Sequence, residues 1–202
     1  MNKTFLKGAC GAFLLILLLG VQGCASVKKP FSAADDLAMQ QRLYGLDLWR
    51  LQGRIAVQTP KDAWSANLFW DHDAHQDRLR ISGPFNQGGV SIVLQDDLIL
   101  IDDGKGATVT SPDPESLLQE RLGFAVPLHS LRYWVLGVPS PDTEFSLGKT
   151  GDGDEHGFRQ QGWDLAYQRF TSVGEVVLPE KATIRGEEVK LKLIASEWVI
   201  GK

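Results

Sequence analysis

The sequence predicts an α+β fold, in which one curled antiparallel sheet is interrupted by a short pair of helices. Apolar and polar residues alternate with period two in many short segments, which is typical of antiparallel strands with one dry and one wet face. Turn residues such as Asp102-Asp103-Gly104 separate these segments, and two helix-like stretches, 113–123 and 127–137, interrupt them. A long sheet with one dry face must curl over its own helices or over a pocket.

The first 23 residues predict a secretory signal peptide. Lys3 and Lys7 supply its positive charge, and residues 13–19 form its unbroken apolar core. This core is too short for a transmembrane helix, which needs ~20 apolar residues. Val21-Gln22-Gly23 before Cys24 resembles the lipobox of bacterial lipoproteins, where the cysteine thiol receives a diacylglycerol and becomes the first mature residue. The alternative is an ordinary signal peptide that is cleaved elsewhere, with Cys24 incidental.

The lipobox resemblance also predicts where the protein resides. Ala25 follows the cysteine, whereas Asp at this position of bacterial lipoproteins often marks retention in the inner membrane. We therefore expect a lipid anchor in the outer membrane, on its periplasmic face. Residues 24–32 then form the lipidated N-terminus and a tether, and residues 33–202 form a single binding domain. Cys10 is lost with the signal peptide, so no disulfide can form within the mature chain.

Length and charge limit the class of protein. Cleavage before Cys24 leaves 179 residues, which fits one domain with a sizeable core. Loss of Lys3 and Lys7 lowers the number of Lys and Arg from 21 to 19 against 25 Asp and Glu, so the mature chain carries a formal charge of −6. The sequence shows no basic stripe that could neutralise phosphates, which argues against nucleic acid as a partner. We expect a monomer.

The alternation assigns a dry side to each predicted strand. The alternating segments are 49–57, 64–70, 78–82, 90–94, 163–167 and 189–193, and residues 98–101 form a short, wholly apolar strand. The candidates for lining a cavity inside the curled sheet are Trp64, Leu68, Trp70, Ile81, Ile92, Leu94, Leu100 and Trp163. Parity does not distinguish a hollow interior from a filled one, so packed core remains the alternative for each residue.

Three segments predict helices. Residues 33–48 are modestly amphipathic. Asp113 can cap a helix that starts at Pro114 and ends at Gly123. Another helix occupies 127–137, between a proline and a glycine. On this last helix, the residues that we expect to cover the opening of the sheet are Leu131, Trp134 and Val135.

Several motifs resemble the LolB family of outer-membrane lipoprotein receptors. They are WRLQGRIAV at 49–57, WSANLFW at 64–70, LRYWVLGVP at 131–139 and LKLIASEW at 191–198. The motif at 131–139 is the most specific, and the resemblance extends from the lipobox to the C-terminus. It implies an incomplete, half-open antiparallel β-barrel of about eleven strands, with inserted helices that cover an apolar cavity.

The resemblance also implies a function and partners. The protein would receive triacylated lipoproteins from the periplasmic carrier LolA and insert them into the inner leaflet of the outer membrane. At ~0.8 kcal/mol per CH₂, one long acyl chain costs roughly 10 kcal/mol or more to expose to water, so it can cross an aqueous space only inside an apolar cavity. The expected partners are LolA, the lipoprotein cargo and outer-membrane lipid, and no cofactor is needed.

The segment that contains Gly83, Pro84 and Phe85 predicts an exposed apolar loop. Phe85 lies among turn residues, where no core position is expected. The LolB resemblance implies that an exposed hydrophobic residue of this loop touches the bilayer during insertion. The family often carries Leu here, and Phe85 is larger but equally apolar. The alternative is a side chain that folds back against the domain.

Enzymatic chemistry finds little support in the sequence. Asp71-His72-Asp73-Ala74-His75 offers two histidines, but it falls in a polar hairpin where we expect a solvated turn and no metal site. Residues 152–163 resemble the start of a calcium loop, but Trp163 occupies the position of the closing Glu. No nucleophile motif or phosphate loop is present. We therefore predict a binding protein without catalytic residues or metal.

Two other classes of binding protein remain open. A lipoprotein with a curved sheet could sense exposed lipid or envelope stress and signal to a partner. It could also be a structural accessory of an envelope assembly machine, which should show a large flat apolar patch in place of an enclosed cavity.

Overall fold

The computed structural model describes residues 33–83, 89–96, 98–141, 143–147 and 156–201. Residues Ala34–Lys202 form one compact unit. Cys24 and the 24–32 tether lie outside the described residues, as do Pro84 and Phe85. The lipidation site and the tip of the membrane loop therefore stay predictions.

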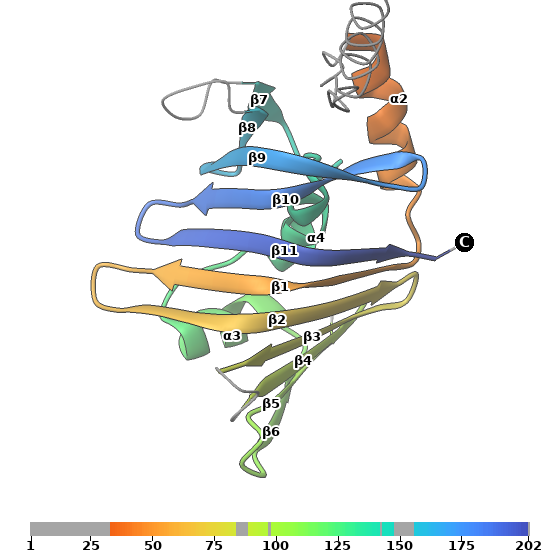
Figure 1. Ribbon diagram of the computed structural model, residues 1–202. Helices are drawn as coiled ribbons and strands as arrows, with labels where there is room; N and C mark the ends of the chain where they lie inside the picture. The colour runs from red at the N-terminus through yellow and green to blue at the C-terminus, as the bar shows by residue number, and fades with distance from the viewer. Residues whose placement is uncertain (1–32, 84–88, 97, 142, 148–155, 202) are drawn as a thin grey trace, which may run out of the picture. The chain divides into compact units, whose positions relative to one another are not determined.

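Eleven strands form one antiparallel sheet (Figure 1). They are β1 (Trp49–Gln58), β2 (Ala63–Asp73), β3 (Gln76–Ser82), β4 (Val90–Gln95), β5 (Leu98–Asp102), β6 (Thr108–Ser111), β7 (Phe145–Leu147), β8 (His156–Gln160), β9 (Trp163–Val173), β10 (Val176–Arg185) and β11 (Lys190–Ile200). Their order across the sheet is β6-β5-β4-β3-β2-β1-β11-β10-β9-β8-β7, so β6 and β7 are free edges and the sheet does not close. The predicted half-open, antiparallel architecture with inserted helices is confirmed.

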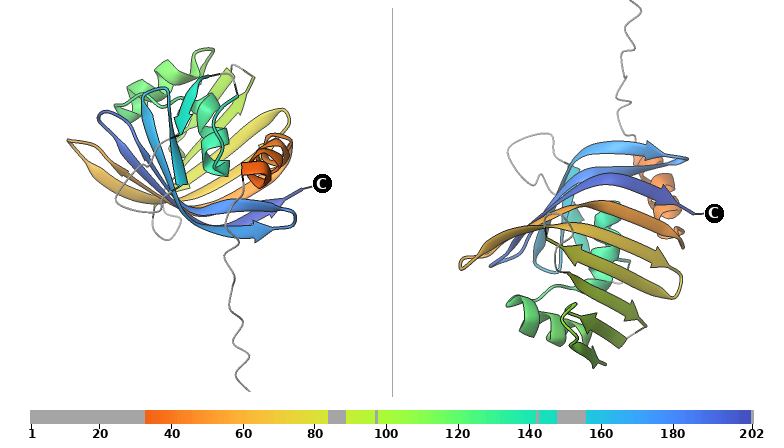
Figure 2. Two further views of the ribbon diagram at one scale, coloured as in Figure 1. Left: turned by 90° about the horizontal axis from the view of Figure 1, so that it is seen from above. Right: turned by 60° about the horizontal axis from the view of Figure 1, so that its bottom comes forward.

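The helical pair connects the two free edges of the sheet. The chain leaves the sheet at β6 and enters it again at β7, and the connection contains α3 (Pro114–Leu122) and α4 (Leu128–Leu136). Because the sheet curls, this connection lies on its concave side (Figure 2). The topology itself therefore puts the helices where they can cover the apolar face of the sheet.

Local chemistry sets the ends of the two inserted helices. The carboxylate of Asp113 accepts a hydrogen bond from the backbone N–H of Ser116 at 3.1 Å, which caps α3. Hydrogen bonding with the side chain and then the backbone of Ser116 lowers the pKa of Asp113. Gly123 and Gly137 end α3 and α4 with φ values of 80° and 87°, a left-handed conformation that favours glycine. A third helix, α2 (Ala33–Tyr44), precedes the sheet. Within the described part of the chain, no helix has the length and apolar character needed to span a membrane.

Cross-strand pairing defines the two faces of the sheet. Leu51 pairs with Trp70, Trp70 with Leu79, Leu79 with Ile92, and Ile92 with Ile101, and all five side chains are buried. Paired residues in neighbouring antiparallel strands point to the same side of a sheet. These residues lie on the side that the helices cover. We call this side the inner face and the opposite side the outer face.

The prediction that Leu100 faces the interior is wrong. Leu100 pairs with Val93, and Val93 pairs with Arg78 on the outer face. Leu100 is 37% exposed, whereas its neighbours Ile99 and Ile101 are buried. The segment 98–101 is wholly apolar, so it contains no alternation that could show which parity faces the core.

Gly53 allows a close approach between β1 and β11. The register of this strand pair shifts between Gln52 and Gly53. A Cβ atom on Gly53 would lie 2.3 Å from the carbonyl oxygen of Ile194, which no other residue could tolerate without separating the strands. Bulges of this kind bend a strand and increase its twist, which helps the sheet to curl around the helices.

Candidate functional site

The inner face and α4 together enclose an apolar interior. Leu51, Leu68 and Leu165 from three strands are buried in it. Trp134 of α4 is fully buried, and its neighbour Val135 belongs to the same core. In this conformation the protein's own side chains therefore occupy the concave side of the sheet.

Gln160 is a buried polar residue that joins β8 to α4 and to the segment after it. Its Oε1 atom accepts hydrogen bonds from Trp134 Nε1 at 2.7 Å and from the backbone N–H of Ser140 at 2.8 Å. Its Nε2 atom donates to the carbonyl oxygens of Ser140 at 2.9 Å and Thr143 at 2.8 Å. Both donors and both acceptor positions of the amide are used. Gln160 therefore fixes the C-terminal end of α4 against the edge of the sheet.

Tyr167 provides a second polar anchor for α4. Its hydroxyl group donates to the carbonyl oxygen of Trp134 at 2.8 Å. Burial raises the pKa of Tyr167 well above its usual value, so the hydroxyl group stays protonated and remains a donor. The ring of Trp163 lies 6.0 Å from that of Trp134. Trp134 is thus the residue through which both anchors hold the helix.

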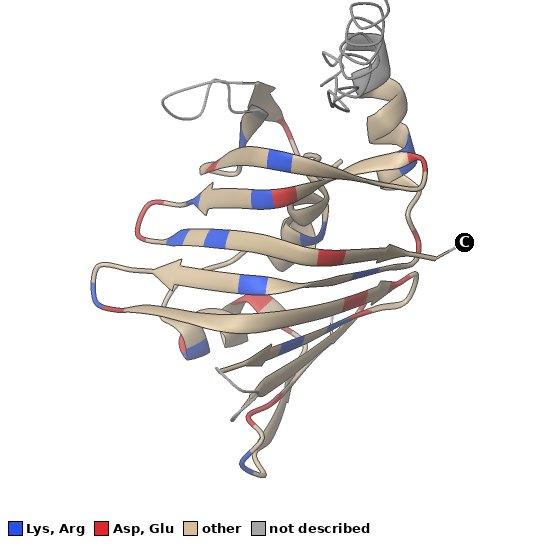
Figure 3. Ribbon diagram, in the orientation of Figure 1, with Lys and Arg blue, Asp and Glu red and all other residues tan. Residues whose placement is uncertain are grey.

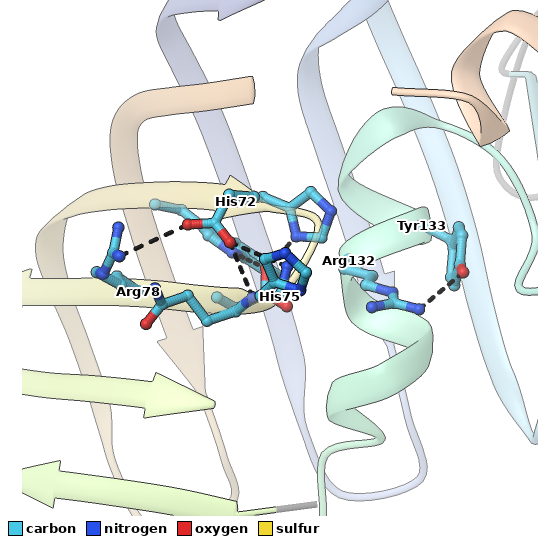
Figure 4. A network of polar contacts seen from close by, with 9 residues as sticks. His72, His75, Arg78, Arg132 and Tyr133 are labelled. Atoms are coloured by element: carbon cyan, nitrogen blue, oxygen red, sulfur yellow. Dashed lines mark hydrogen bonds and ion pairs between the residues drawn. The ribbon is translucent and has the colours of Figure 1, made fainter. Parts of the chain in front are cut away.

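The opposite side of α4 is only half-buried. Arg132 Nη2 donates to the hydroxyl oxygen of Tyr133 at 2.9 Å, and its guanidinium group lies 4.8 Å from the centre of the Tyr133 ring (Figure 4). Tyr133 also meets Tyr44 of α2, with ring centres 6.0 Å apart, and the Tyr44 hydroxyl donates to the carbonyl oxygen of Pro139 at 3.0 Å. The end of α2 therefore supports α4 from outside the core.

A second polar group lies on the inner face, inside a cluster of tryptophans. The Trp49 ring lies within 6 Å of the rings of Trp70, His72 and Trp198. Asp77 accepts a hydrogen bond from Trp70 Nε1 at 2.7 Å and contacts Nδ1 of His72 at 2.8 Å (Figure 4). The expectation that both histidines lie in a solvated turn is therefore wrong for His72, which lies on β2.

A metal site is not formed around these histidines. His75 lies in the exposed turn after β2, apart from the pair formed by His72 and Asp77. The described residues contain no group of three or more His, Cys, Asp or Glu side chains that could hold a metal ion. His72 and Asp77 are a hydrogen-bonded polar pair, which adds specific contacts to the apolar core.

The structure brings most of the predicted lining residues together. On the inner face, the buried ones are Leu68, Trp70, Ile92, Leu94 and Trp163, and Ile81 is half-buried. On α4, Trp134 and Val135 are buried and Leu131 is half-buried. Trp64 has the same parity but lies at the end of the sheet, where it is 36% exposed. Gly83 is half-buried and directly precedes the part of its loop that lies outside the described residues.

Three residues that position the site escaped the sequence interpretation. Gln160, Tyr167 and Asp77 are buried, and each bonds a tryptophan or its backbone. Asp77 shares the parity of Leu79 and Ile81, so the alternation already places it on the dry side. Gln160 shares the parity of Phe158, but β8 contains only this one large apolar residue, so its sequence shows no alternation from which a dry side could be assigned.

Two hollows open on the sheet away from this interior. The first, of about 290 Å³, is lined by Ala56, Val57, Gln58, Ala63, Trp64, Ser65, Lys190 and Lys192. The second, of about 300 Å³, is lined by Phe69, Asp71, Arg78, Leu79, Arg80 and Ser91. Most of these residues have the parity of the outer face. Whether the interior opens into a larger cavity stays a prediction.

Comparison with known proteins agrees with this architecture. Residues 47–198 match the family model of LolB, described as outer membrane lipoprotein LolB. The chain belongs to the LolB family. The match begins just before β1, ends within β11 and includes α3 and α4, so it covers the sheet and its helical cover but not α2.

Relatives across the genus Pseudomonas support this assignment. The outer-membrane lipoprotein LolB of Pseudomonas fluorescens is 32% identical over 195 residues, which cover 93% of each chain. The LolB of Pseudomonas aeruginosa is 28% identical over 190 residues, again 93% of each chain. The chain is thus an outer-membrane lipoprotein by family, as the lipobox and Ala25 predict.

One solved structure shows the fold independently of sequence. A LolA superfamily protein from Nitrosomonas europaea superposes with a TM-score of 0.51 at 9% sequence identity, over 81% of this chain and 90% of that one. At this identity the likeness concerns the fold alone. The half-open sheet with a helical cover is therefore shared between this LolB family member and a member of the LolA superfamily.

Proposed function

We propose that this chain receives acylated lipoproteins from a LolA-type periplasmic carrier and inserts them into the inner leaflet of the outer membrane. The acyl chains would lie between the inner face and α4. The observation that carries this proposal is an apolar inner face, open at two sheet edges and covered by the short helices α3 and α4. Membership of the LolB family and the fold shared with a LolA superfamily protein support the same function.

The packed interior means that α4 must move before cargo can enter. Trp134 and Val135 occupy the space that an acyl chain needs. The four hydrogen bonds of Gln160 and the one from Tyr167 are each worth about 0.5–1.5 kcal/mol net. In a transfer from the carrier the acyl chains do not start in water, so their gain is only the difference between the two apolar interiors. In this proposal, the contacts of several acyl chains with the inner face replace the contacts that α4 gives up.

Transfer in this form requires no reaction at the protein. Each step is downhill if the cargo prefers this interior to that of the carrier, and the bilayer to this interior. The site consists of apolar side chains and of buried polar side chains that already have hydrogen-bond partners. Such a site is suited to binding and releasing an apolar cargo. No covalent bond has to form or break.

The loop after β3 is the part of the chain that we propose to contact the bilayer. Asn67 Nδ2 donates to the carbonyl oxygen of Gly83 at 3.3 Å, which fixes the start of this loop to β2. Pro84 and Phe85 follow directly in the sequence. In this proposal Phe85 enters the acyl boundary while the cargo leaves the interior, as the LolB resemblance implies.

A pair of neighbouring residues tests whether cargo enters the interior. A photoreactive amino acid replaces Ile92, which is on the inner face, or Val93, which is on the outer face. The carrier is loaded with an acylated lipoprotein and mixed with each variant under illumination. We expect crosslinks to cargo from position 92 and none from position 93. Equal crosslinking from both positions, or from 93 alone, would contradict uptake between the inner face and α4.

A further inference from the structure

The outer face gathers basic residues where β10 and β11 meet. Arg185 pairs with Lys190 across the two strands, and Lys190 pairs with Gln58 of β1. Lys192 lies two residues further along β11 and therefore points to the same side. Figure 3 shows these basic segments at neighbouring strand ends. The sequence shows no basic stripe, because the sheet brings together residues that are separated along the chain.

Short side chains beside these lysines create the first hollow. Ala56 pairs with Lys192 on one side and with Ser65 on the other, and Ala63 pairs with Gln58. Small residues next to long ones leave the space of about 290 Å³. Ser65, Lys190 and Lys192 are among the residues that line it, and their side chains carry a hydroxyl group and two ammonium groups that can donate hydrogen bonds.

Among the described residues, Lys190 and Lys192 form no ion pair in this hollow, although Glu187 and Glu188 lie in the turn between β10 and β11. Burial, together with the charges of Lys192 and Arg185, lowers the pKa of Lys190. A bound anion would relieve this repulsion. The second hollow differs, because Asp71 lines it and Arg78 pairs with Asp73 at 3.5 Å.

The hollow lies at the same end of the sheet as Gly83, the last described residue before Pro84 and Phe85 in the sequence. Ser65 is two residues from Asn67, which has the same parity and holds the Gly83 carbonyl oxygen. Trp64, at the rim of the hollow, is 36% exposed. Basic side chains, an exposed aromatic ring and an apolar loop together are typical of a surface that meets the headgroup layer of a membrane.

We propose that this hollow binds the phosphate group of an anionic phospholipid at the membrane surface, through Lys190, Lys192 and Ser65. The inference rests on the proposed function, because it assigns the same end of the sheet to the bilayer. Lysine is a suitable ligand, since its ammonium group binds phosphate as a point charge. The bound headgroup would orient the domain so that the loop after β3 faces the acyl region.

Amine labelling of the full, acylated chain tests this site. The protein is reconstituted into vesicles of phosphatidylcholine alone or of phosphatidylcholine mixed with phosphatidylglycerol. Amine-reactive reagents modify the neutral form of lysine, and a bound phosphate favours the charged form. We expect Lys190 and Lys192 to react about fivefold more slowly in the anionic vesicles. This factor corresponds to the binding free energy of about 1 kcal/mol that one lysine contributes near an anionic membrane surface. Lys181, further along β10, should change less.

Two matched variants separate a specific site from general attraction. Lys192→Gln should abolish the protection of Lys190. Arg80→Gln removes the same charge from the outer face at the second hollow, and it should leave that protection unchanged. The inference is overturned by equal labelling rates in both vesicle types, by equal effects of the two variants, or by protection from inorganic phosphate with no response to phosphatidylglycerol.

The labelling experiment needs neither carrier nor cargo. Protected lysines in a protein that takes up no cargo would therefore contradict the proposed function and leave the headgroup site standing. Normal cargo transfer with unprotected lysines would overturn the headgroup site alone.

Discussion

At the residue scale, a few polar side chains on an apolar face decide how the interior is held closed. Gln160, Tyr167 and Asp77 are each buried and each fully engaged. Within the described residues, every buried side-chain nitrogen or oxygen has a hydrogen-bond partner. Buried polar groups with hydrogen-bond partners add little net stability, but breaking their bonds is costly. They therefore select one position of α4, whereas apolar contacts alone would allow several.

Gln160→Glu should weaken the attachment of α4 without changing the size of the side chain. The carboxylate cannot donate to the carbonyl oxygens of Ser140 and Thr143, and each buried group left without a partner costs about 1–3 kcal/mol. Thermal unfolding should therefore shift to clearly lower temperature. Gln119→Glu is the matched control, because its side chain is exposed on α3, and it should melt close to the unmodified protein. Equal melting temperatures for both variants would remove Gln160 from the role of anchor.

Phe85→Glu should separate receiving cargo from delivering it. Phe85 is not one of the residues that we propose to hold acyl chains, so uptake from the carrier should stay near normal. An exposed Phe gains up to ~2–3 kcal/mol on entering the acyl boundary, whereas a carboxylate is repelled by an anionic surface. Insertion of cargo into liposomes should therefore fail for Phe85→Glu and succeed for Phe85→Leu. If Phe85→Glu inserts cargo as well as the unmodified chain does, the loop has no membrane role.

At the element scale, each strand is defined by which of its sides faces the helices. Segments with alternation, such as 49–57 and 64–70, are assigned to the correct side from sequence alone. The apolar segment 98–101 is not, because its register depends on pairing with β4. The pairing partners lie on another strand, and no pattern within the segment itself records them.

Ile101→Asp and Leu100→Asp place the same charge on opposite faces of β5. Ile101 is 7% exposed and belongs to the core, so its replacement should cost about 3 kcal/mol or more. Leu100 faces solvent, and its replacement should cost less than about 1 kcal/mol. Denaturant unfolding of the two variants measures the difference. A larger loss for Leu100→Asp would show that the register of β5 is wrong.

The inserted helices were predictable for a similar local reason. Asp113, Pro114 and Gly123 are capping residues at fixed spacings, and the structure uses them at the expected ends of α3. The contacts of α4 were not predictable in this way. From the sequence, Trp134 is one more apolar residue of a helix. Its hydrogen bonds join it to Gln160 and Tyr167, which lie 26 and 33 residues later in the chain, on β8 and β9.

At the scale of the whole domain, the helices that cover the inner face belong to the connection between the two free edges of the sheet. β6 and β7 end the sheet on either side, and α3 and α4 link them. Such a connection can move away from the inner face while the strand ladder stays intact, because neither helix contributes to the ladder. The interior is therefore packed when empty, and it can admit an acyl chain only in a second arrangement of α4.

The distance between α4 and the sheet tests this claim most directly. Spin labels are attached to His129→Cys on the exposed side of α4 and to Glu197→Cys on the outer face of β11. The mature chain's own Cys24 is predicted to be acylated and so unreactive toward the label. A second pair, Arg80→Cys with Glu197→Cys, lies within the sheet and serves as the control. Binding of an acylated lipoprotein should lengthen the first distance and leave the second unchanged. Bound cargo with both distances unchanged would contradict uptake of the acyl chains beneath α4.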